Sequence, residues 1–474
     1  MTHEGRRPGD RRIRVERTRP EQFTIKTPKR LRRPPPASLV LVAGFTVMIV
    51  LGTIILMLPI SSQSGEITPF IDALFTATSA VCVTGLVVVD TGTYWSPVGQ
   101  AAILVLIQAG GFGFMTSSTL LLLFLVRRRT TLRDRVVAQE SLGGLQLGAV
   151  APLIRRIAIF TIAAEIIGAI ILTAAFAASG EVDGPASAWW GVFHSVSAFN
   201  NAGFDIIGGF RSLIPFADNW VIVPVIGVLV FLGGIGFAIV GDVWSKRSWV
   251  GLALETKLVL STSLVLLTFG ALFVAFSEWG NPATLGALSD GDRVLNSIFQ
   301  SVTARTAGFN TLDTGSLLEP TLFVVMALMF IGGASGSTAG GIKVNTLSVL
   351  VIAIVSTIKG DPSATAFGRR IQHAVVYRAL SVALLSAGVF FTIALALSLL
   401  VDSIFIEIVF ESVSAFATVG LSTGITPDLN EAGRLVVTAG MFAGRLGPLT
   451  LVLALAARAH VVAYRPAVES VRIG

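Results

Sequence analysis

The sequence predicts an all-α membrane protein made of four copies of one unit, in which a helix, a re-entrant loop and a second helix follow one another. Of its 474 residues, 53% are hydrophobic and 13% are charged, so the chain has more apolar surface than a soluble core can bury. Residues 38–60 contain no Lys, Arg, Asp or Glu, and about 20 apolar residues cross a bilayer as a helix. A short motif built around one glycine occurs four times, which indicates a repeated architecture.

The first hydrophobic stretch follows a strongly basic tail. Residues 1–33 contain twelve Lys or Arg against four Asp or Glu, in a chain of net charge +7. Basic residues beside a first span favour the cytoplasmic side, and this span is too long and too far along the chain for a cleavable signal peptide. We therefore expect a cytoplasmic tail over 1–37 that contacts membrane lipids, with a regulatory subunit as the other candidate and no nucleic-acid partner.

The glycine motif is the clearest internal repeat. It reads FTATSAVCVTGL (75–86), FHSVSAFNNAGF (193–204), FQSVTARTAGF (299–309) and FESVSAFATVGL (410–421), and its glycines lie 118, 105 and 112 residues apart. Each copy lies between two hydrophobic stretches, which predicts eight spanning helices. These stretches are 38–60 and 97–126, 153–178 and 220–240, 257–276 and 321–357, and 376–401 and 433–457.

Each glycine motif includes a half-polar stretch of about a dozen residues that is too short to span a membrane. Such a stretch, followed by a strand that contains glycine, indicates a re-entrant helix and loop. Membrane proteins tolerate this backbone only beside protein or a water-filled cavity. Small residues that merely let helices pack closely would explain one copy, but not four copies at matching positions. The sequence therefore predicts four pore loops in a pseudo-fourfold arrangement around one ion pore.

The repeats divide the chain into successive units. The predicted order is the cytoplasmic tail (1–37), pore repeats 1 (38–135), 2 (136–250), 3 (251–360) and 4 (361–458), and a C-terminal cytoplasmic tail (459–474). Basic residues gather in alternate connections, within 127–135, 246–247, 359–370 and 458–472, while the other connections are comparatively acidic. By the positive-inside rule, we expect both termini in the cytoplasm and the four pore loops entering from outside.

Three residues at each recurring glycine form the candidate selectivity filter. Glycine permits φ/ψ values that a Cβ would strain, so carbonyl oxygens can face one axis and replace the hydration shell of an ion. Four helix C-termini aimed at the centre add partial negative charge, which favours a cation. The candidate filter residues are Val83, Thr84, Gly85, Asn201, Ala202, Gly203, Thr306, Ala307, Gly308, Thr418, Val419 and Gly420.

A stretch rich in glycine and serine interrupts the second hydrophobic stretch of the third repeat. Residues 321–357 would form a helix of about 55 Å, too long for one straight span, with Lys343 as its only charge. We expect a broken helix whose intramembrane loop is a gate, with a simple kink as the alternative. It is no nucleotide-binding P-loop, because Ile342 separates Gly341 from Lys343. The candidate gate residues are Gly332, Gly333, Ala334, Ser335, Gly336, Ser337, Thr338, Ala339, Gly340, Gly341, Lys343 and Arg445.

Arg445 is included because a charge inside a membrane helix is costly and tends to mark function. A fixed cation just below the filter could interact with carbonyl groups of the loop and repel cations while the path is closed. A structural tie between helices is the alternative interpretation of this residue.

The four degenerate pore repeats and the TVG sequence of the fourth resemble the superfamily of K⁺ transporters that includes the Trk, Ktr and HKT proteins. FQSVTARTAGFNT (299–311), GGASGSTAGGIKVNT (332–346) and MFAGRLGPLT (441–450) look most like the KtrB type of membrane subunit. The resemblance implies K⁺ uptake across a bacterial plasma membrane, with K⁺ at the filter carbonyls and the glycine-rich stretch as the gate near Arg445. It also implies a homodimer on a cytosolic ring of KtrA-type subunits that bind ATP or ADP. Na⁺ is a candidate activator, and no organic cofactor is expected on this chain.

Two further charged residues could have a role. Glu165, inside a hydrophobic stretch, could couple transport to Na⁺ or H⁺ in a secondary K⁺ symporter, or could simply pair with a neighbouring helix. Arg305 would block cations if it faced the axis, so we expect it behind the filter, bound to backbone carbonyls or to a carboxylate such as Glu411. A scaffold that has lost conduction is another alternative. Motifs of hydrolases and metalloenzymes are not apparent, so the protein is not expected to be an enzyme.

Overall fold

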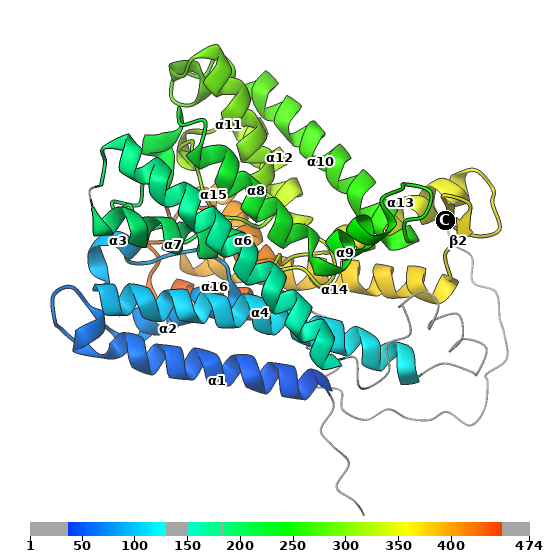
Figure 1. Ribbon diagram of the computed structural model, residues 1–474, viewed down its shortest axis with the longest axis horizontal. Coiled ribbons are helices and arrows are strands. Elements are labelled where there is room, and N and C mark those ends of the chain that lie inside the picture. Colours follow the sequence, from blue (N-terminus) through cyan, green and yellow to red (C-terminus); the bar gives the residue numbers. More distant parts are fainter. Residues whose placement is uncertain (1–36, 129–149, 183, 448–474) are drawn as a thin grey trace, which may run out of the picture. The chain divides into compact units, whose positions relative to one another are not determined.

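The computed structural model describes residues 37–128, 150–182 and 184–447. Helices dominate this part of the chain (Figure 1), and it contains one small antiparallel sheet of β1 (Thr365–Ala366) and β2 (Arg369–Arg370), in which Thr365 pairs with Arg370. Residues 1–36 and 448–474, which include most of the two predicted basic tails, lie outside the described residues.

The helices follow the order of the four predicted repeats. The first repeat contains α1 (Ala37–Met57), η1 (Pro59–Ser61), α2 (Phe70–Cys82), α3 (Thr91–Tyr94) and α4 (Pro97–Arg128). The second contains α6 (Val150–Ser179), α7 (Pro185–Phe199), η3 (Ile214–Phe216), α8 (Ile222–Ile235) and α9 (Phe237–Lys246). The third contains α10 (Leu254–Glu278), η4 (Leu285–Ala287), α11 (Asp290–Thr303), η5 (Thr314–Ser316), α12 (Glu319–Phe330) and α13 (Val344–Ile358). The fourth contains α14 (His373–Leu400), α15 (Phe405–Ala417) and α16 (Glu431–Leu446).

A short helix precedes each recurring glycine, as the sequence predicts. Helices α2, α7, α11 and α15 contain 13, 15, 14 and 13 residues, which is too short for a span. Local sequence defines where several of these helices begin. Pro185 occupies the first turn of α7, and the Ser289 side chain accepts from the Asp292 amide at the start of α11.

The eight predicted hydrophobic stretches are mainly helical where they are described, but residues 331–343 interrupt the stretch 321–357, and the stretches are not eight straight spans. By length and composition, α1, α4, α6, α10 and α14 are long and apolar enough to cross a membrane. The stretch 220–240 was predicted as one helix and is instead the pair α8 and α9, bent by 92°. Gly236 at the bend has φ +82°, a value that favours glycine and ends α8. The described part of the last stretch ends at residue 447.

The predicted break in the third repeat is present. Helix α12 ends at Phe330 and α13 begins at Val344, and residues 331–343 between them form an irregular loop. Ile331 and Ile342 pair as an isolated β-bridge, so the loop closes on itself at its base. The alternative of a simple kink is therefore wrong.

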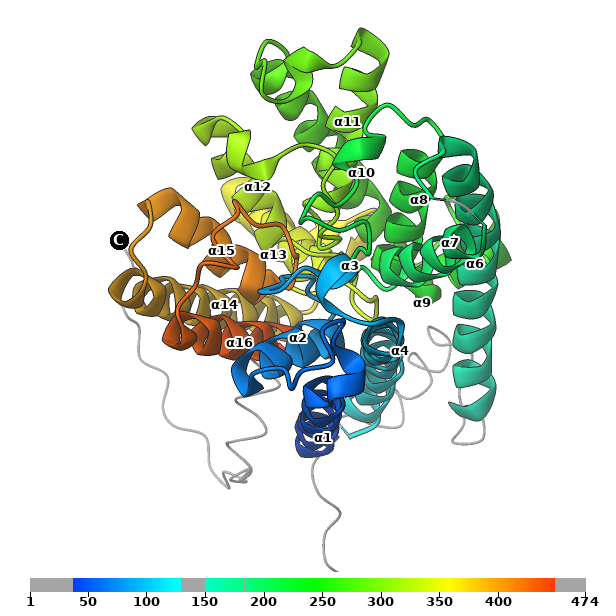
Figure 2. The same ribbon diagram turned by 90° about the vertical axis from the view of Figure 1, so that its left-hand side faces the viewer.

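Four hydrophobic clusters connect the repeats in a closed circuit. One cluster joins buried residues of the first and second repeats, another those of the second and third, and another those of the third and fourth. The remaining large cluster joins the fourth repeat to the first, where Arg434 of α16 also pairs with Asp72 of α2 at 2.5 Å. Figure 2 shows the four groups of helices following one another around a common centre. The short helices and their glycine motifs are thereby brought together.

The first helix of each repeat carries much of the exposed apolar surface. In the most apolar windows of α1, α6 and α10, 28% of residues are buried, and in α14 only 17%, against 50% in α4. Large side chains such as Leu272 and Phe276 on α10 and Leu399 on α14 are more than half exposed. Apolar surface of this extent is typical of helices that face lipid.

Candidate functional site

The four glycine segments are residues 83–85, 201–203, 306–308 and 418–420, and they share one backbone conformation. The first residue and the glycine of each segment have positive φ: 56° and 92° at Val83 and Gly85, 59° and 69° at Asn201 and Gly203, 69° and 83° at Thr306 and Gly308, and 50° and 96° at Thr418 and Gly420. A residue with a Cβ pays about 1–2 kcal/mol for this region, so the surrounding structure must impose it. Backbone conformations with positive and negative φ thus alternate along each segment, and this alternation turns successive carbonyl groups towards the same side.

The four glycines meet in a ring. A Cβ on Gly203 would lie 2.7 Å from the Ala307 carbonyl oxygen, and one on Gly308 would lie 2.6 Å from that of Val419. A Cβ on Gly420 would overlap the carbonyl oxygen of Thr84, and one on Gly85 would overlap that of Ala202. Each segment therefore faces the next in chain order, and the fourth faces the first. Glycine is required here both by its φ and by the close approach of backbone.

The backbone N–H groups of the segments point back to the short helices. The middle residue of each segment donates to a carbonyl of the preceding helix: Thr84 to Ser79 at 2.8 Å, Ala202 to Ser197 at 2.8 Å, Ala307 to Thr303 at 3.0 Å and Val419 to Ser414 at 2.9 Å. Hydroxyl groups of the same helices add further bonds. The Ser79 hydroxyl accepts from the Gly85 amide, and the Ser414 hydroxyl accepts from the Gly420 amide. All these N–H groups therefore donate to the short helices, on the outer side of the ring.

The carbonyl oxygens of the segments have no such partners. Among the described residues, none of these oxygens accepts a hydrogen bond, although the segments are almost fully buried. Buried backbone carbonyls are normally satisfied, so a ring of them without donors requires another partner. A dehydrated cation is chemically suited to such a ring, because carbonyl oxygens can replace its hydration shell.

The loop 331–343 packs against the second and fourth segments. The Ala334 amide donates to Gly234 at 2.9 Å, and the Thr338 hydroxyl donates to Asn201 Oδ1 at 2.8 Å. A Cβ on Gly340 would lie 2.5 Å from the Ala417 carbonyl oxygen, just before the fourth segment. Hydrogen bonds and close packing thus hold the loop beside the glycine ring.

The other loop residues divide into a buried part and an exposed turn. Ser335 is exposed and Gly336 is half-buried, beside the bend at Gly236. The Ser337 hydroxyl, by contrast, is buried and donates to Ala334 O at 2.7 Å. The remaining candidate residues of the loop, Gly332, Gly333, Ala339 and Gly341, lie close to the loop's own backbone or to the adjacent helices.

Two cations lie under the loop. Arg445 is buried and donates to the Thr338 carbonyl and, at 3.5 Å, to that of Gly110. Lys343 donates to the carbonyls of Ala339 and Gly340. Within the described part of the chain, neither cation forms an ion pair with a carboxylate. The positive charges of Arg445 and Lys343 are therefore not neutralised by a described carboxylate, and they act on the space beside the loop.

An aromatic residue that the sequence analysis did not single out connects these cations. The ring of Phe114 on α4 lies 4.4 Å from the guanidinium carbon of Arg445 and 5.2 Å from Lys343 Nζ. Both distances are within the range of cation–π interactions. A phenylalanine in a hydrophobic stretch carries no sequence signal of its own, so this role appears only in three dimensions.

Of the residues two positions after the four glycines, one is acidic. Asp205 follows Gly203 and Phe204, is half-buried, and accepts from the Ile207 amide at 3.2 Å. Burial and then the nearby carboxylate of Asp90 raise its pKa to about 7. This titratable group was also missed in the sequence.

Glu165 and Arg305 both lie behind the glycine ring. Glu165 accepts from Gln108 Nε2 at 3.2 Å and from Asn200 Nδ2 at 3.0 Å, which ties α6 to α4 and to the end of α7. Arg305 binds Ser263 of α10, by the backbone carbonyl and the hydroxyl. The suggested carboxylate partner Glu411 does not pair with Arg305, because it accepts from the Thr426 hydroxyl instead.

Comparison with known proteins agrees with this architecture. The family model of TrkH, described as a cation transport protein, matches residues 21–461. The Ktr system potassium uptake protein B of Bacillus subtilis is 40% identical over 91% of this chain and 95% of its own length. The potassium/sodium uptake protein NtpJ of Enterococcus hirae is 38% identical over 95% of this chain and 100% of its own length.

A solved structure has the same fold. The crystal structure of the potassium transporter TrkH from Vibrio parahaemolyticus superimposes with a TM-score of 0.69, covering 90% of this chain and 86% of that chain at 20% identity. The likeness at this identity concerns the fold, while the family model and the relatives above extend over nearly the whole sequence. The chain therefore belongs to the TrkH family of cation transport proteins and is a multi-pass membrane protein.

Proposed function

We propose that the chain is the ion-conducting membrane subunit of a K⁺ uptake system. The four glycine segments form its selectivity filter, with pseudo-fourfold symmetry and K⁺ bound at the carbonyl oxygens. The observation that carries the proposal is the ring of buried carbonyls that have no donors among the described residues. The four short helices end at this ring, and their C-terminal dipoles favour a cation there. The names of the relatives above, which are uptake proteins for potassium or for potassium and sodium, support K⁺ as the ion.

The loop 331–343 acts as the gate of this path. Its bonds to Asn201 and Gly234 hold it beside the filter, and the charges of Lys343 and Arg445 oppose the passage of a cation. Opening requires the loop to leave this position, which breaks its hydrogen bonds to α8, to Asn201 and to Arg445. The glycines of the loop allow the necessary change in backbone conformation.

The membrane subunit works in a larger assembly. We place it in a bacterial plasma membrane with both termini in the cytoplasm, as a homodimer on a ring of KtrA-type subunits that bind ATP or ADP. The relatives named after a Ktr system support this arrangement. Na⁺ acts as an activator; the name of the relative NtpJ, a potassium/sodium uptake protein, supports only that Na⁺ can be handled by such a protein.

A secondary K⁺ symporter is the second candidate. The supporting observation is Glu165, a buried carboxylate inside α6 that forms no ion pair with a described cation. Its bonds to Gln108 and Asn200 connect it to the end of the helix that carries the second segment. In this alternative, K⁺ flux is stoichiometrically tied to Na⁺ or H⁺.

Growth of a K⁺-uptake-deficient bacterium on low K⁺ tests the proposal. The strain carries the protein with its regulatory subunit, as wild type, as Gly420→Asp or as Gly388→Ala, with Na⁺ present or absent. Gly388 lies on α14 with open space around its Cα and serves as the matched control. Rescue by the wild type and by Gly388→Ala, but not by Gly420→Asp, is expected. Absence of rescue by expressed wild type, together with absence of K⁺ flux in purified protein, contradicts the conducting role.

A further inference from the structure

A lateral pocket opens beside the filter and the gate. It contains about 300 Å³ of empty space, part of which is open to the surroundings, and lies between α8, α10, α11 and the loop 331–343. Its lining consists of Val230, Phe231, Gly234, Ile235, Ser263, Leu267, Val302, Arg305 and Gly333. Apart from Arg305 and Ser263, these side chains are apolar or absent.

The cation in this pocket is not neutralised by the protein. Only 8% of Arg305 is exposed, and its Nε has no hydrogen-bond partner among the described residues. Its bonds to Ser263 measure 3.2 and 3.4 Å, and the described residues offer it no carboxylate. A guanidinium has five N–H donors, and a buried charge without a partner costs several kcal/mol. The pocket therefore calls for an anionic acceptor that is not part of the chain.

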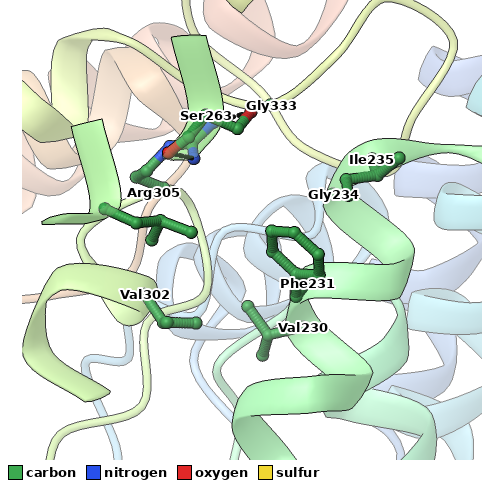
Figure 3. Close-up of a pocket in the computed structure, with 9 residues that line it drawn as sticks. Val230, Phe231, Gly234, Ile235, Ser263, Val302, Arg305 and Gly333 are labelled. Atoms are coloured by element: carbon green, nitrogen blue, oxygen red, sulfur yellow. Dashed lines mark hydrogen bonds between the residues drawn. The ribbon is translucent and has the colours of Figure 1, made fainter. Parts of the chain in front are cut away.

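The pocket has a polar end and an apolar end. In Figure 3, the nitrogen atoms of Arg305 lie beside Ser263 and Gly333, whereas Val230 and Val302 lie at the opposite end. Phe231, which is 37% exposed, lies beside Val230. Such a lining suits a molecule with one charged head and one hydrocarbon chain.

We propose that this pocket binds a long-chain fatty acid, with its carboxylate on Arg305 and its chain along Val230, Phe231 and Val302. Arginine and carboxylate form strong charge-assisted hydrogen bonds. Gly234 and Ile235 of the pocket lie 12 and 13 residues after the start of α8, or roughly 19 Å along that helix. A helix that begins at the membrane surface brings such residues into the hydrocarbon of a core about 30 Å thick. A fatty acid reaches this depth as the neutral acid and ionises beside the guanidinium. A phospholipid phosphate carries its charge throughout and would have to leave the interface.

An occupant would contact the loop proposed as the gate, because Gly333 lines the same pocket. The Ala334 amide next to it donates to Gly234, which is also part of the lining. The bound acid would therefore lie beside the hydrogen bond that joins Ala334 to Gly234. Binding itself does not depend on the proposed conduction, so it is measured without ion flux.

Photolabelling of the purified full-length protein in nanodiscs tests the proposal. The probes are palmitate with a diazirine in its chain, hexadecanol with the same group, and a diazirine-labelled phosphatidylglycerol, and the labelled peptides are mapped by mass spectrometry. We expect saturable labelling by the palmitate probe around Phe231 or Val302, displaced by unlabelled palmitate and not by hexadecanol. Arg305→Met is expected to weaken this binding about tenfold or more, as the loss of a bond between charged groups predicts.

Two tryptophan variants keep Arg305 in place and protect the test against misfolding of Arg305→Met. Leu267→Trp fills the pocket and is expected to abolish the saturable labelling. Leu272→Trp places the same side chain on an exposed position of α10 and is expected to leave the saturable labelling unchanged. Equal labelling by the palmitate and hexadecanol probes, equal labelling by the phospholipid probe, or undiminished labelling of Leu267→Trp would each overturn the proposal.

Discussion

The ring of Phe114 lies against Arg445, with 4.4 Å between its centroid and the guanidinium carbon, and also lies 5.2 Å from Lys343 Nζ. One aromatic residue of the first repeat thus contacts a cation of the third repeat and a cation of the fourth. The face of the ring carries partial negative charge, which offsets part of the repulsion between the two cations. The position of both charges beside the loop therefore depends on Phe114.

Phe114→Leu keeps apolar volume and removes the aromatic face. Cation–π contacts contribute about 0.5–2 kcal/mol, so we expect the closed arrangement to weaken and K⁺ leak without the regulatory subunit to rise several-fold. Flux of K⁺ from liposomes containing the purified protein measures this. Because both residues act on one contact, Phe114→Leu combined with Arg445→Gln should change the leak by less than the sum of the single variants. Strict additivity would contradict the coupling.

Gly308→Ala should impair K⁺ uptake far more than Gly388→Ala. The new Cβ would meet the Val419 carbonyl oxygen at 2.6 Å, at a φ of +83°, and strain of about 1–2 kcal/mol accompanies this conformation alone. Since about 1.4 kcal/mol is a factor of ten, we expect K⁺ affinity to fall about tenfold or more. Concentration-dependent ⁸⁶Rb⁺ uptake in cells measures the half-saturating concentration. An unchanged affinity in the Gly308→Ala variant would argue against a tight glycine ring.

Thr338→Val breaks the bond between the loop and the second segment. The Thr338 hydroxyl is buried and donates to Asn201 Oδ1 at 2.8 Å, and an unsatisfied buried acceptor costs about 1–3 kcal/mol. We expect a lower melting temperature and a larger leak of K⁺ in liposomes. Thr357→Val is the matched control, because the Thr357 hydroxyl donates only within α13, to Ala353 O, and is exposed. Equal effects of the two substitutions would show that the loop is not held through Asn201.

Glu165→Gln separates the channel from the symporter. An amide retains one acceptor for Gln108 or Asn200, so a structural role predicts K⁺ uptake within roughly threefold of wild type. A coupling role predicts that accumulation of K⁺ against its gradient, driven by an imposed Na⁺ or H⁺ gradient, disappears while passive exchange remains. Proteoliposomes with imposed ion gradients distinguish these outcomes.

Asp205 should make K⁺ uptake depend on external pH. Its raised pKa of about 7 means that the carboxyl group is mainly neutral at pH 6 and mainly charged at pH 8. A negative charge beside the filter attracts cations, so the half-saturating K⁺ concentration should rise as pH falls through 7. A contribution of about 1 kcal/mol corresponds to roughly fivefold. At every pH, Asp205→Asn should have the high half-saturating K⁺ concentration that the wild type shows at low pH. If the pH profile of Asp205→Asn is identical to that of the wild type, this carboxylate is excluded as the titrating group.

The sequence predicts the short helices and the glycine segments because both have local signatures. A stretch too short to span, followed by glycine, repeats at nearly constant spacing, and the structure places a short helix before each recurring glycine. The break between α12 and α13 was predictable for the same reason, since glycine and serine mark it in the sequence.

The bend at Gly236 and the contacts of Phe114 were not predictable in this way. Four glycines lie inside the run 220–240, at 227, 233, 234 and 236. Glycine is tolerated inside membrane helices, so these residues do not by themselves show that α9 turns by 92°. Phe114 acquires its role only because α4 of the first repeat packs beside Arg445, which is more than 300 residues away in sequence. The partner of Arg305 illustrates the same limit, because the sequence suggested backbone carbonyls or a carboxylate such as Glu411, and only packing places Ser263 of α10 beside it, with its carbonyl and its hydroxyl.

The four glycine segments present the same backbone with four different sequences, because one chain encodes all of them. In an assembly of four identical subunits, every substitution would appear on all sides at once. Here a single amino-acid substitution alters one of the four segments and leaves the other three unchanged. The chemistry around a bound ion can therefore diverge in small steps. Asp205 already shows such divergence, since Val87, Asn310 and Ser422 follow the other three glycines at the same distance. A bound ion therefore has different neighbouring residues on its four sides. Evolution can then favour ion positions that lie away from the central axis.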